Sequence, residues 1–295
     1  MKEQIIDGIN YRLNEETKTA EVIKKNGGYE GDIIIPETVV FNERIYRVTS
    51  IGEGAFYQCE SLKSIIIPDS VTSIGDGAFC DCESLTYITI PDSITSIGDC
   101  ALKECSSLTT ITIPNGITSI GEGTFSYCKS LKSITIPNGI TSIGEGTFCG
   151  CESLTNIVVA KGNTIYDSRE ECNAIIETGT NTLICGCQTS IIPSSVTRIG
   201  EGAFFHCESL TDITIPNSVK SIEDGAFCQC SSLTSITIPN SVTSIEYAAF
   251  WDCSLLTSIT FQGTIAQWNK ITLGEDWNNK VPATVVHCTD GDVEI

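Results

Sequence analysis

A unit of 23 residues repeats along most of this chain, and this repeat limits the possible folds more than any other feature. Prolines keep the spacing at Pro68, Pro91, Pro114 and Pro137, and again at Pro193, Pro216 and Pro239. Cysteines keep it at Cys59, Cys82, Cys105, Cys128 and Cys151, and again at Cys207, Cys230 and Cys253. A unit of this length cannot bury its apolar side chains alone, so the repeat predicts an array of stacked coils.

Each unit is expected to contain two short strands and a corner. In residues 232–245, the Leu-x-x-Ile-x-Ile segment ends in the alternation typical of a strand with one buried face. Pro239 ends this strand because proline has no N–H group to donate to a sheet. The Val and Ile that follow, three residues apart, predict a second short extended segment. A Gly-rich corner such as Gly75-x-Gly77 then returns the chain.

Two insertions interrupt the repeat, and each predicts a hairpin. The first, residues 41–47, extends the first coil. The second, an island at about residues 160–192, contains two apolar runs at 173–177 and 182–185 around a loop with glycine. Apolar runs separated by such a loop are typical of paired antiparallel strands.

The ends of the array need caps, because an open stack exposes apolar side chains and unpaired strand edges. Residues 1–35 predict a β-hairpin cap with strands around 9–13 and 20–23. Residues 36–261 then form the repeat array, and residues 262–295 form a small α/β cap.

The C-terminal cap is expected to hold a short helix and a hairpin. Thr264 can cap the helix, and Ile265, Trp268 and Ile271 share one of its faces. Asp290-Gly291 predicts the turn of a hairpin between the apolar residues around 285 and those around 293.

Charge excludes several classes of partner. The chain has 17 basic and 37 acidic residues, a net charge of −20, so it lacks the basic face that nucleic acids or anionic lipids require.

No apolar run is long enough to span a membrane. The first residues lack the apolar core of a signal peptide, so we expect either that the protein stays in the cytoplasm or that an export signal has been removed.

The repeat resembles the BspA-type leucine-rich repeats of bacteria. The resemblance is carried by the Leu-x-x-Ile-x-Ile-Pro…Ile-Gly…Ala-Phe-x-x-Cys unit over residues 36–261, and by residues 166–176 and 281–288. It implies a β-rich leucine-rich-repeat solenoid, coiled right-handedly. It also implies a cell-surface or secreted protein of a host-associated microbe, often an adhesin, and the exported members carry a signal sequence that is not visible here.

The cysteines and histidines predict neither a metal site nor catalysis. Eight of the 16 cysteines belong to the repeat and suit a buried, reduced ladder. The Cys-x-Cys pairs, Cys185/Cys187 among them, lack the spacing of common zinc sites. His206 and His287 have no visible orienting partner. We therefore expect a non-enzymatic protein with no cofactor.

Acidic residues recur at the corner of the coils. They are Glu53, Asp76, Asp99, Glu122, Glu145, Glu201 and Asp224. Stacking sets like charges one coil apart, and solvent is expected to screen them. The ligand pattern of calcium-binding β-solenoids is absent, so no calcium site is predicted.

The candidate binding residues are those that alternate with the buried positions of the longer strands. They are Tyr87, Thr89, Thr110, Thr112, Ser133, Thr135, Asn156, Asp212, Thr214, Ser235 and Thr237. They predict a face of small hydroxyls with few charges, on the concave side of a monomeric array. Host matrix or cell-surface proteins are the expected partners; an intracellular interaction scaffold and a glycan-binding module are the alternatives.

Deleting one whole unit, residues 231–253, should lower the melting temperature less than deleting ten residues within it. The full deletion only shortens the stack, whereas the partial one moves apolar side chains out of register with the neighbouring coils. Thermal unfolding of the two variants measures the difference. Equal melting curves would contradict the stacked-coil fold.

Overall fold

The chain is β-rich with almost no helix. A computed structural model describes residues 1–295, which divide into two compact units, Met1–Phe148 and Cys149–Ile295. The first unit contains β1 to β13, and the second contains β14 to β25. The second unit also contains the two short helices of the chain, the α-helix α1 (Ile265–Trp268) and the 3₁₀ helix η1 (Arg169–Glu171).

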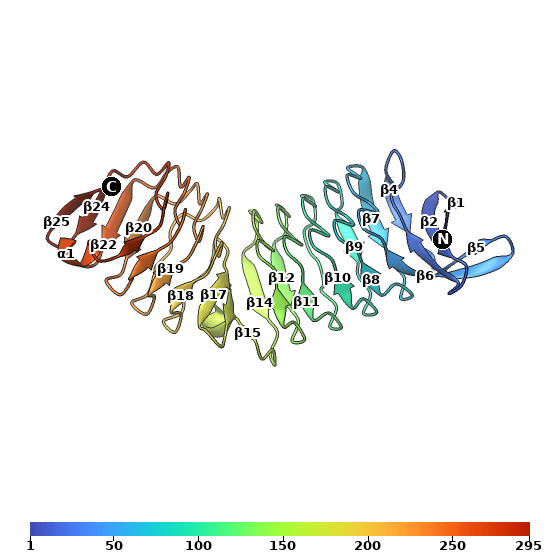
Figure 1. The fold of residues 1–295 in the computed structure, drawn as a ribbon, viewed down its shortest axis with the longest axis horizontal. Coiled ribbons are helices and arrows are strands. Elements are labelled where there is room, and N and C mark those ends of the chain that lie inside the picture. The colour runs from blue at the N-terminus through green and yellow to red at the C-terminus, as the bar shows by residue number, and fades with distance from the viewer. The chain divides into compact units, whose positions relative to one another are not determined.

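The first unit begins with paired antiparallel strands (Figure 1). Strands β2 (Ile9–Asn14) and β3 (Thr19–Val22) lie where the sequence predicts them, and β1 (Lys2–Ile6) adds a strand that was not predicted. Strand β3 then pairs in parallel with β6 (Arg44–Ile51). The first insertion forms the expected hairpin, in which β5 (Thr38–Phe41) pairs antiparallel with β6.

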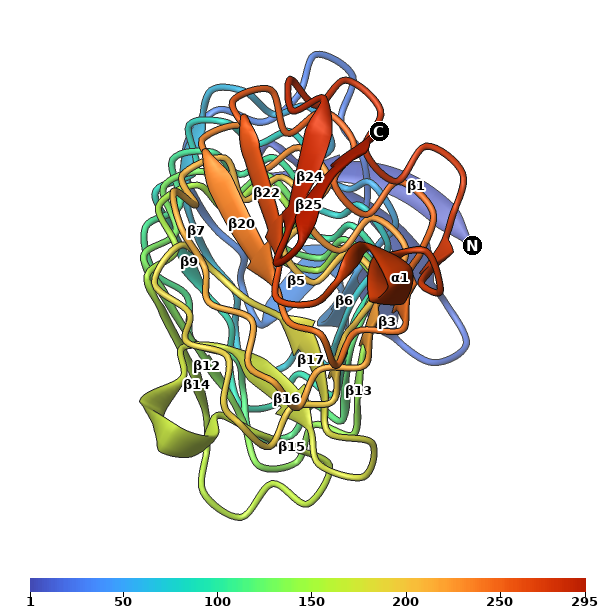
Figure 2. The same cartoon turned by 90° about the vertical axis from the view of Figure 1, so that its left-hand side faces the viewer.

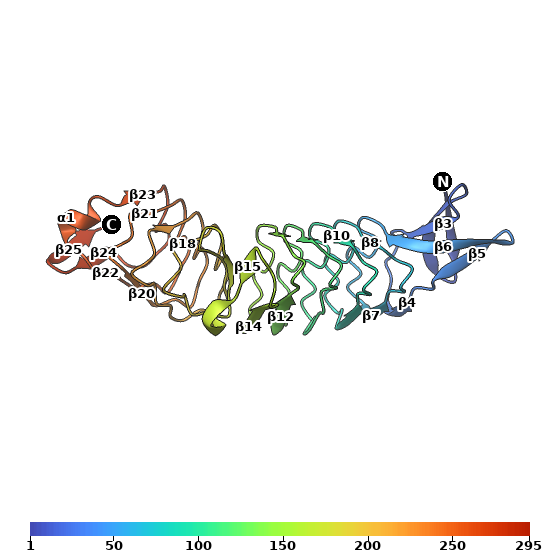
Figure 3. The same cartoon turned by 90° about the horizontal axis from the view of Figure 1, so that it is seen from below.

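The coils of the first unit have longer strands on one side and two-residue strands on the other (Figure 3). The longer strands are β4 (Gly31–Ile34), β7 (Leu62–Ile66), β9 (Tyr87–Thr89) and β12 (Ser133–Ile136). The short ones are β8 (Ser73–Ile74), β10 (Ser96–Ile97), β11 (Ser119–Ile120) and β13 (Ser142–Ile143). Parallel pairs join β4, β7 and β9 in one series, β6, β8 and β10 in another, and β11 with β13. Residues of neighbouring repeats face one another 23 positions apart, as Ser64 faces Tyr87. One coil of this unit lacks the expected longer strand, because Thr110 makes only a single bridge to Ser133, and in the second unit Thr214 likewise makes only a single bridge to Thr237.

The second unit begins with β14 (Asn156–Val159) and the island. Strands β15 (Tyr166–Asp167), β16 (Ile175–Glu177) and β17 (Thr182–Cys185) pair antiparallel, so the predicted hairpin is present with one additional strand. Strand β17 then starts a parallel series of short strands. The series continues through β18 (Arg198–Ile199), β19 (Ser221–Ile222), β21 (Ser244–Ile245) and β23 (Thr272–Leu273).

The longer strands of the second unit lie side by side at its C-terminal end (Figure 2). Strands β20 (Ser235–Ile238), β22 (Ser258–Phe261) and β24 (Val285–Cys288) pair in parallel, and β25 (Gly291–Glu294) turns back against β24. The predicted helix is α1, and its N-terminus has a capping box between Thr264 and Gln267. The buried Trp268 anchors it to the core.

Apolar side chains of the repeat fill the interior of each unit. The repeat Phe, Leu and Cys positions are almost all buried, and the phenylalanine rings stack from coil to coil. In the second unit the ring centroids of Phe204 and Phe227 are 5.0 Å apart, and those of Phe227 and Phe250 are 5.2 Å apart. Identical side chains thus form continuous columns, because each coil adds the same shape to the one before.

The repeat cysteines link neighbouring coils through their thiols. The Cys105 Sγ donates to the Phe79 carbonyl oxygen at 3.3 Å, and the Cys253 Sγ donates to the Phe227 carbonyl oxygen at 3.0 Å. Cys82, Cys128 and Cys230 make the same contact with the carbonyl 26 residues earlier. Each of these carbonyl oxygens also accepts a main-chain N–H of its own coil, as Phe79 O accepts the Cys82 N–H at 3.3 Å. The thiol thereby adds a second hydrogen bond, from the next coil, to a buried acceptor, which explains a small donor at this position.

The corner of each coil requires a left-handed backbone residue. Glycine serves at most of these positions, as at Gly77 with φ +55°. The equivalent residues of other coils are Cys100 with φ 54° and Ala248 with φ 52°. A side chain at such a φ costs about 1 kcal/mol or more, so these two coils carry local strain that the others avoid.

Gly77→Ala should lower the free energy of unfolding by about 1 kcal/mol, because alanine disfavours the left-handed region. Its added Cβ would meet nothing closer than the Cys80 Cβ at 3.8 Å, so no steric clash contributes. Ala248→Gly should raise the free energy of unfolding, but by a smaller amount, since glycine also raises the entropy of the unfolded chain. Urea unfolding of both variants checks this, and a loss of stability in both would refute it.

Candidate binding surface

The outward positions of the longer strands form the surface that the sequence predicts for binding. Along β20 the burial alternates, with Ile236 and Ile238 buried and Ser235 and Thr237 exposed. Of the predicted residues, Thr89 and Ser133 are half-buried, and the others are exposed. The register aligns them in columns, because each strand pairs with the equivalent residue of the next coil.

Two groups of threonines differ in what their hydroxyls do. Thr86 and Thr257 donate to the main-chain carbonyl of the preceding coil, at 3.1 and 3.4 Å, and so help to hold coils together. Thr112 and Thr135 of the first unit lie further along the strand, and their hydroxyls make no hydrogen bond within the protein. Thr214 and Thr237 of the second unit are likewise unbonded. These hydroxyls remain available to a partner.

The N-terminal end of this surface in the first unit is apolar. Ile34 pairs with Ile66 across β4 and β7, and the two are 69% and 43% exposed. Tyr87 on β9 is 56% exposed and lies opposite Ser64. Large exposed apolar side chains that share one sheet face favour contact with another molecule. The sequence indicated Tyr87, but neither isoleucine was among the candidates.

The corresponding surface of the second unit carries more polar groups. Thr237 faces Thr260, which in turn faces His287 of β24. The His287 Nδ1 lies 2.9 Å from an Asp292 carboxylate oxygen, so this histidine does have a partner that the sequence did not reveal. Both side chains are largely exposed, and no nucleophile is placed against them in this pair. The arrangement extends the polar face of the longer strands.

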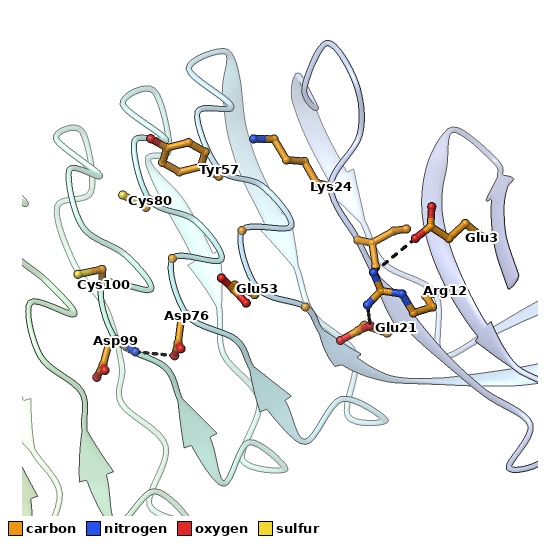
Figure 4. Close-up of a pocket in the computed structure, with 14 residues that line it drawn as sticks. Glu3, Arg12, Glu21, Lys24, Glu53, Tyr57, Asp76, Cys80, Asp99 and Cys100 are labelled. Carbon is orange, nitrogen blue, oxygen red and sulfur yellow. Dashed lines mark hydrogen bonds and ion pairs between the residues drawn. The ribbon is translucent and has the colours of Figure 1, made fainter. Parts of the chain in front are cut away.

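A depression of about 780 Å³ lies on the corner side of the first unit (Figure 4). Most of its charged groups are engaged within the protein. Arg12 contacts Glu21 at 2.7 Å and Glu3 at 3.4 Å, and the Lys24 Nζ lies 4.7 Å from the centre of the Tyr57 ring. This depression was not predicted, because its walls come from the N-terminal strands and from three separate coils.

The corner carboxylates are exposed, as expected, but three of them also have a structural role. Asp76 accepts a hydrogen bond from the Asp99 N–H at 3.0 Å, and Asp99 accepts one from the Glu122 N–H at 2.9 Å. Asp224 accepts the Tyr247 N–H at 2.9 Å in the same way. The expectation of purely solvated charges was therefore incomplete, because aspartate reaches the main chain of the next coil and satisfies its donor.

Most thiols of the repeat are poor nucleophiles and poor metal ligands as they stand. Cys59 differs, because hydrogen bonds from Cys82 and from the Tyr29 main chain lower its pKa to about 7. None of the 16 cysteines forms a disulfide bond. Burial raises the pKa of Cys128 to about 12 and that of Cys253 to about 12, from an ordinary value of 9.0. Thiolates are the reactive and metal-binding form, so a raised pKa disfavours both roles. No group of three or more His, Cys, Asp or Glu residues is placed to hold a metal ion.

The comparisons with known proteins agree with this architecture. A family model for the BspA-type leucine-rich repeat region matches residues 49–172 and 183–274 in six copies. The chain belongs to this family. Leucine-rich repeat proteins generally bind other proteins, and typical members are not enzymes. No helix of this family member is long and apolar enough to cross a membrane.

Solved structures of bacterial leucine-rich repeat proteins are similar to this chain. One from Bacteroides ovatus is 31% identical, with a TM-score of 0.70 over 97% of this chain and 71% of that one. One from T. pallidum is 25% identical, with a TM-score of 0.52 over 79% of this chain and 91% of that one. The pneumococcal vaccine antigen PcpA, at 18% identity and a TM-score of 0.64 over 98% and 88%, shows the fold alone. No curated protein matches the sequence.

Stability should fall as the pH rises above about 9, because the thiols of the unfolded chain then ionise while buried ones stay protonated. The contribution of Cys128 and Cys253 is fully present below pH 9.0 and is lost towards pH 12. Each thiol should remove about 1.4 kcal/mol per pH unit in this window. Urea unfolding at several pH values measures the slope.

Cys128→Ala and Cys253→Ala should each reduce that slope, although both also lower stability at neutral pH. Ser133→Ala, which removes a hydroxyl and no thiol, is the control and should leave the slope unchanged. A slope that is the same in all four proteins would show that the buried thiols do not cause the alkaline loss.

Proposed function

We propose that this protein is a non-enzymatic binding protein that recognises a macromolecular partner, in the first place a protein, through the outward face of its longer strands. The observation that carries the proposal is the column of unbonded hydroxyls that includes Thr112 and Thr135. These side chains are not needed for coil-to-coil hydrogen bonding, unlike Thr86. A polar face with unused donors and acceptors suits a partner that can complete them.

The charge of this face supports a partner that is not strongly charged. The outward pairs from Ser64/Ile66 to Ser133/Thr135 contain no ionisable group other than the Tyr87 phenol. At the edge of the face, the Asp32 carboxylate of β4 accepts a hydrogen bond from the Ser64 hydroxyl at 2.6 Å, and most other acidic residues of the coils lie at the corner. One carboxylate gives little long-range attraction for a basic partner, so affinity must come mainly from packing and hydrogen bonds.

Ile34, Ile66 and Tyr87 are the proposed anchor of the surface. Buried aromatic and aliphatic side chains contribute most of the free energy at protein interfaces, and hydroxyl-bearing neighbours supply complementarity. The remaining candidates, from Thr89 to Thr237, are proposed to extend the contact in their own units.

We propose further that the protein acts at the cell surface or outside the cell, as an adhesion-type protein. The family resemblance supports this location.

The domain division belongs to the same proposal. Residues 1–35 and 262–295 would cap a single right-handed solenoid of residues 36–261, with the island at 160–192. The parallel pairing of β7 with β9, and of β20 with β22, supports stacked coils within each unit. Capped ends would keep the protein monomeric, because they cover the apolar side chains of the terminal coils.

Binding to immobilised extracellular-matrix proteins and to intact host cells tests the proposal. The double variant Thr112→Arg/Thr135→Arg should weaken binding about tenfold or more, because it places two large charged groups on the neutral face. Thr118→Arg is the matched control. Thr118 is an exposed threonine beside the short strand β11, and its hydroxyl makes no hydrogen bond within the protein. The control variant should therefore bind as the unmodified protein does.

No binding to any of these targets by folded protein would count against a surface adhesin. An equal loss in the control and the face variant would place the binding surface elsewhere. Binding of a neutral polysaccharide with the same dependence on Thr112 and Thr135 would instead support the glycan-binding alternative.

A further inference from the structure

We propose that Asn115 and Asn138 are sites of spontaneous deamidation, where the chain converts to aspartate and isoaspartate without an enzyme. Each lies in an exposed turn directly after the proline that ends a longer-strand segment, and each is followed by glycine. The equivalent turns elsewhere have Asp-Ser, Asn-Ser or Ser-Ser at these two positions. The proposal does not depend on the identity of the binding partner.

The two Asn-Gly turns are the loosest of the series. The turn is closed by a hydrogen bond from Ile117 N to the Pro114 oxygen at 3.4 Å, and from Ile140 N to the Pro137 oxygen at 3.3 Å. The five equivalent bonds are 3.0–3.1 Å, from Val71, Ile94, Val196, Val219 and Val242. A longer bond is a weaker one, so these two turns open more readily.

Glycine also removes a tether that serine supplies in two other coils. The Ser93 Oγ donates to the Val71 oxygen at 2.6 Å, and the Ser241 Oγ donates to the Val219 oxygen at 2.8 Å. Gly116 and Gly139 have no hydroxyl to donate, and their own N–H groups make no hydrogen bond. In deamidation the main-chain nitrogen of the residue after asparagine attacks the asparagine side chain. Here that nitrogen belongs to Gly116 or Gly139, so it makes no hydrogen bond and its backbone has the conformational range of glycine.

The reaction is an intramolecular substitution that needs only water. The Gly116 main-chain nitrogen loses its proton to solvent base and bonds to the Asn115 side-chain carbonyl carbon, and ammonia leaves. Water then opens the resulting five-membered succinimide. Breaking the new bond gives aspartate, and breaking the original peptide bond gives isoaspartate, in which the main chain runs through the side chain. Asn138 and Gly139 react in the same way.

The two products should affect the coil differently. Aspartate occupies this turn position naturally at Asp69 and Asp92, so conversion to aspartate adds a charge beside Thr112 or Thr135 and leaves the backbone intact. Isoaspartate lengthens the main chain by one carbon in a coil that pairs with neighbours at a fixed spacing. Ageing of the folded protein would therefore produce one tolerated form and one destabilised form at each site.

Peptide mapping by mass spectrometry tests the proposal on the full chain, kept folded in mildly alkaline buffer. Asn115 and Asn138 should each gain the mass of an amide-to-acid exchange, with isoaspartate separated from aspartate by chromatography. Asn217 and Asn240, which precede serine, should react about tenfold more slowly or less. Gly116→Ser and Gly139→Ser, which copy the other turns, should slow their own sites to that rate.

Asn115→Asp should unfold like the unmodified chain, because Asp92 has the same place in the preceding coil. The unfolded chain in urea provides the reference rate for each site. Deamidation of Asn115 and Asn138 in the unfolded chain alone would overturn the proposal, since the folded turn would then hold the reacting groups apart. Equal rates at all four asparagines in the folded chain would overturn it as well.

Discussion

The hydrogen-bonded contact between one coil and the next is the interaction on which the rest of this structure depends. A single coil exposes most of its main chain and has only one layer of apolar side chains, so it cannot offset the entropy lost on ordering. Stacking solves both problems together. The main-chain groups of one coil bond those of its neighbours, as Gly75 N bonds the Ile51 oxygen at 2.9 Å, while the apolar columns become continuous.

Side chains add hydrogen bonds to that contact. The Cys105 thiol and the Thr86 hydroxyl each donate to a carbonyl oxygen of the adjacent coil that also accepts a main-chain N–H, whereas the Asp76 carboxylate accepts the Asp99 N–H. Three chemically different residues thus recur for one reason, since each adds a hydrogen bond between neighbouring coils. Their recurrence has no relation to catalysis or metal binding, although cysteines and carboxylates in columns invite that interpretation.

The surface available for function is what remains after this requirement is met. Thr112 and Thr135 share the residue type of Thr86 but lie at a different position of the repeat, and their hydroxyls stay unbonded. Function in such a fold is therefore carried by outward positions that the coil contact does not constrain. The same freedom explains how Asn-Gly turns can occur between coils whose turns contain serine.

Much of this architecture follows from the sequence alone, because its signals are local or periodic. The spacing of proline and cysteine indicated the coil length, and the alternation of Ile and Thr separated buried from exposed positions. The cap residue Thr264 and the apolar positions that follow it located the only α-helix. Strand β1, the missing strand around Thr110, the left-handed Ala248 and the role of Asp76 were beyond it. The missing strand and the role of Asp76 depend on how closely two coils approach, a distance of ångströms between residues about 23 positions apart. A repeat in sequence specifies which residues will face one another; only the folded stack decides which of their polar groups meet and which are left for a partner.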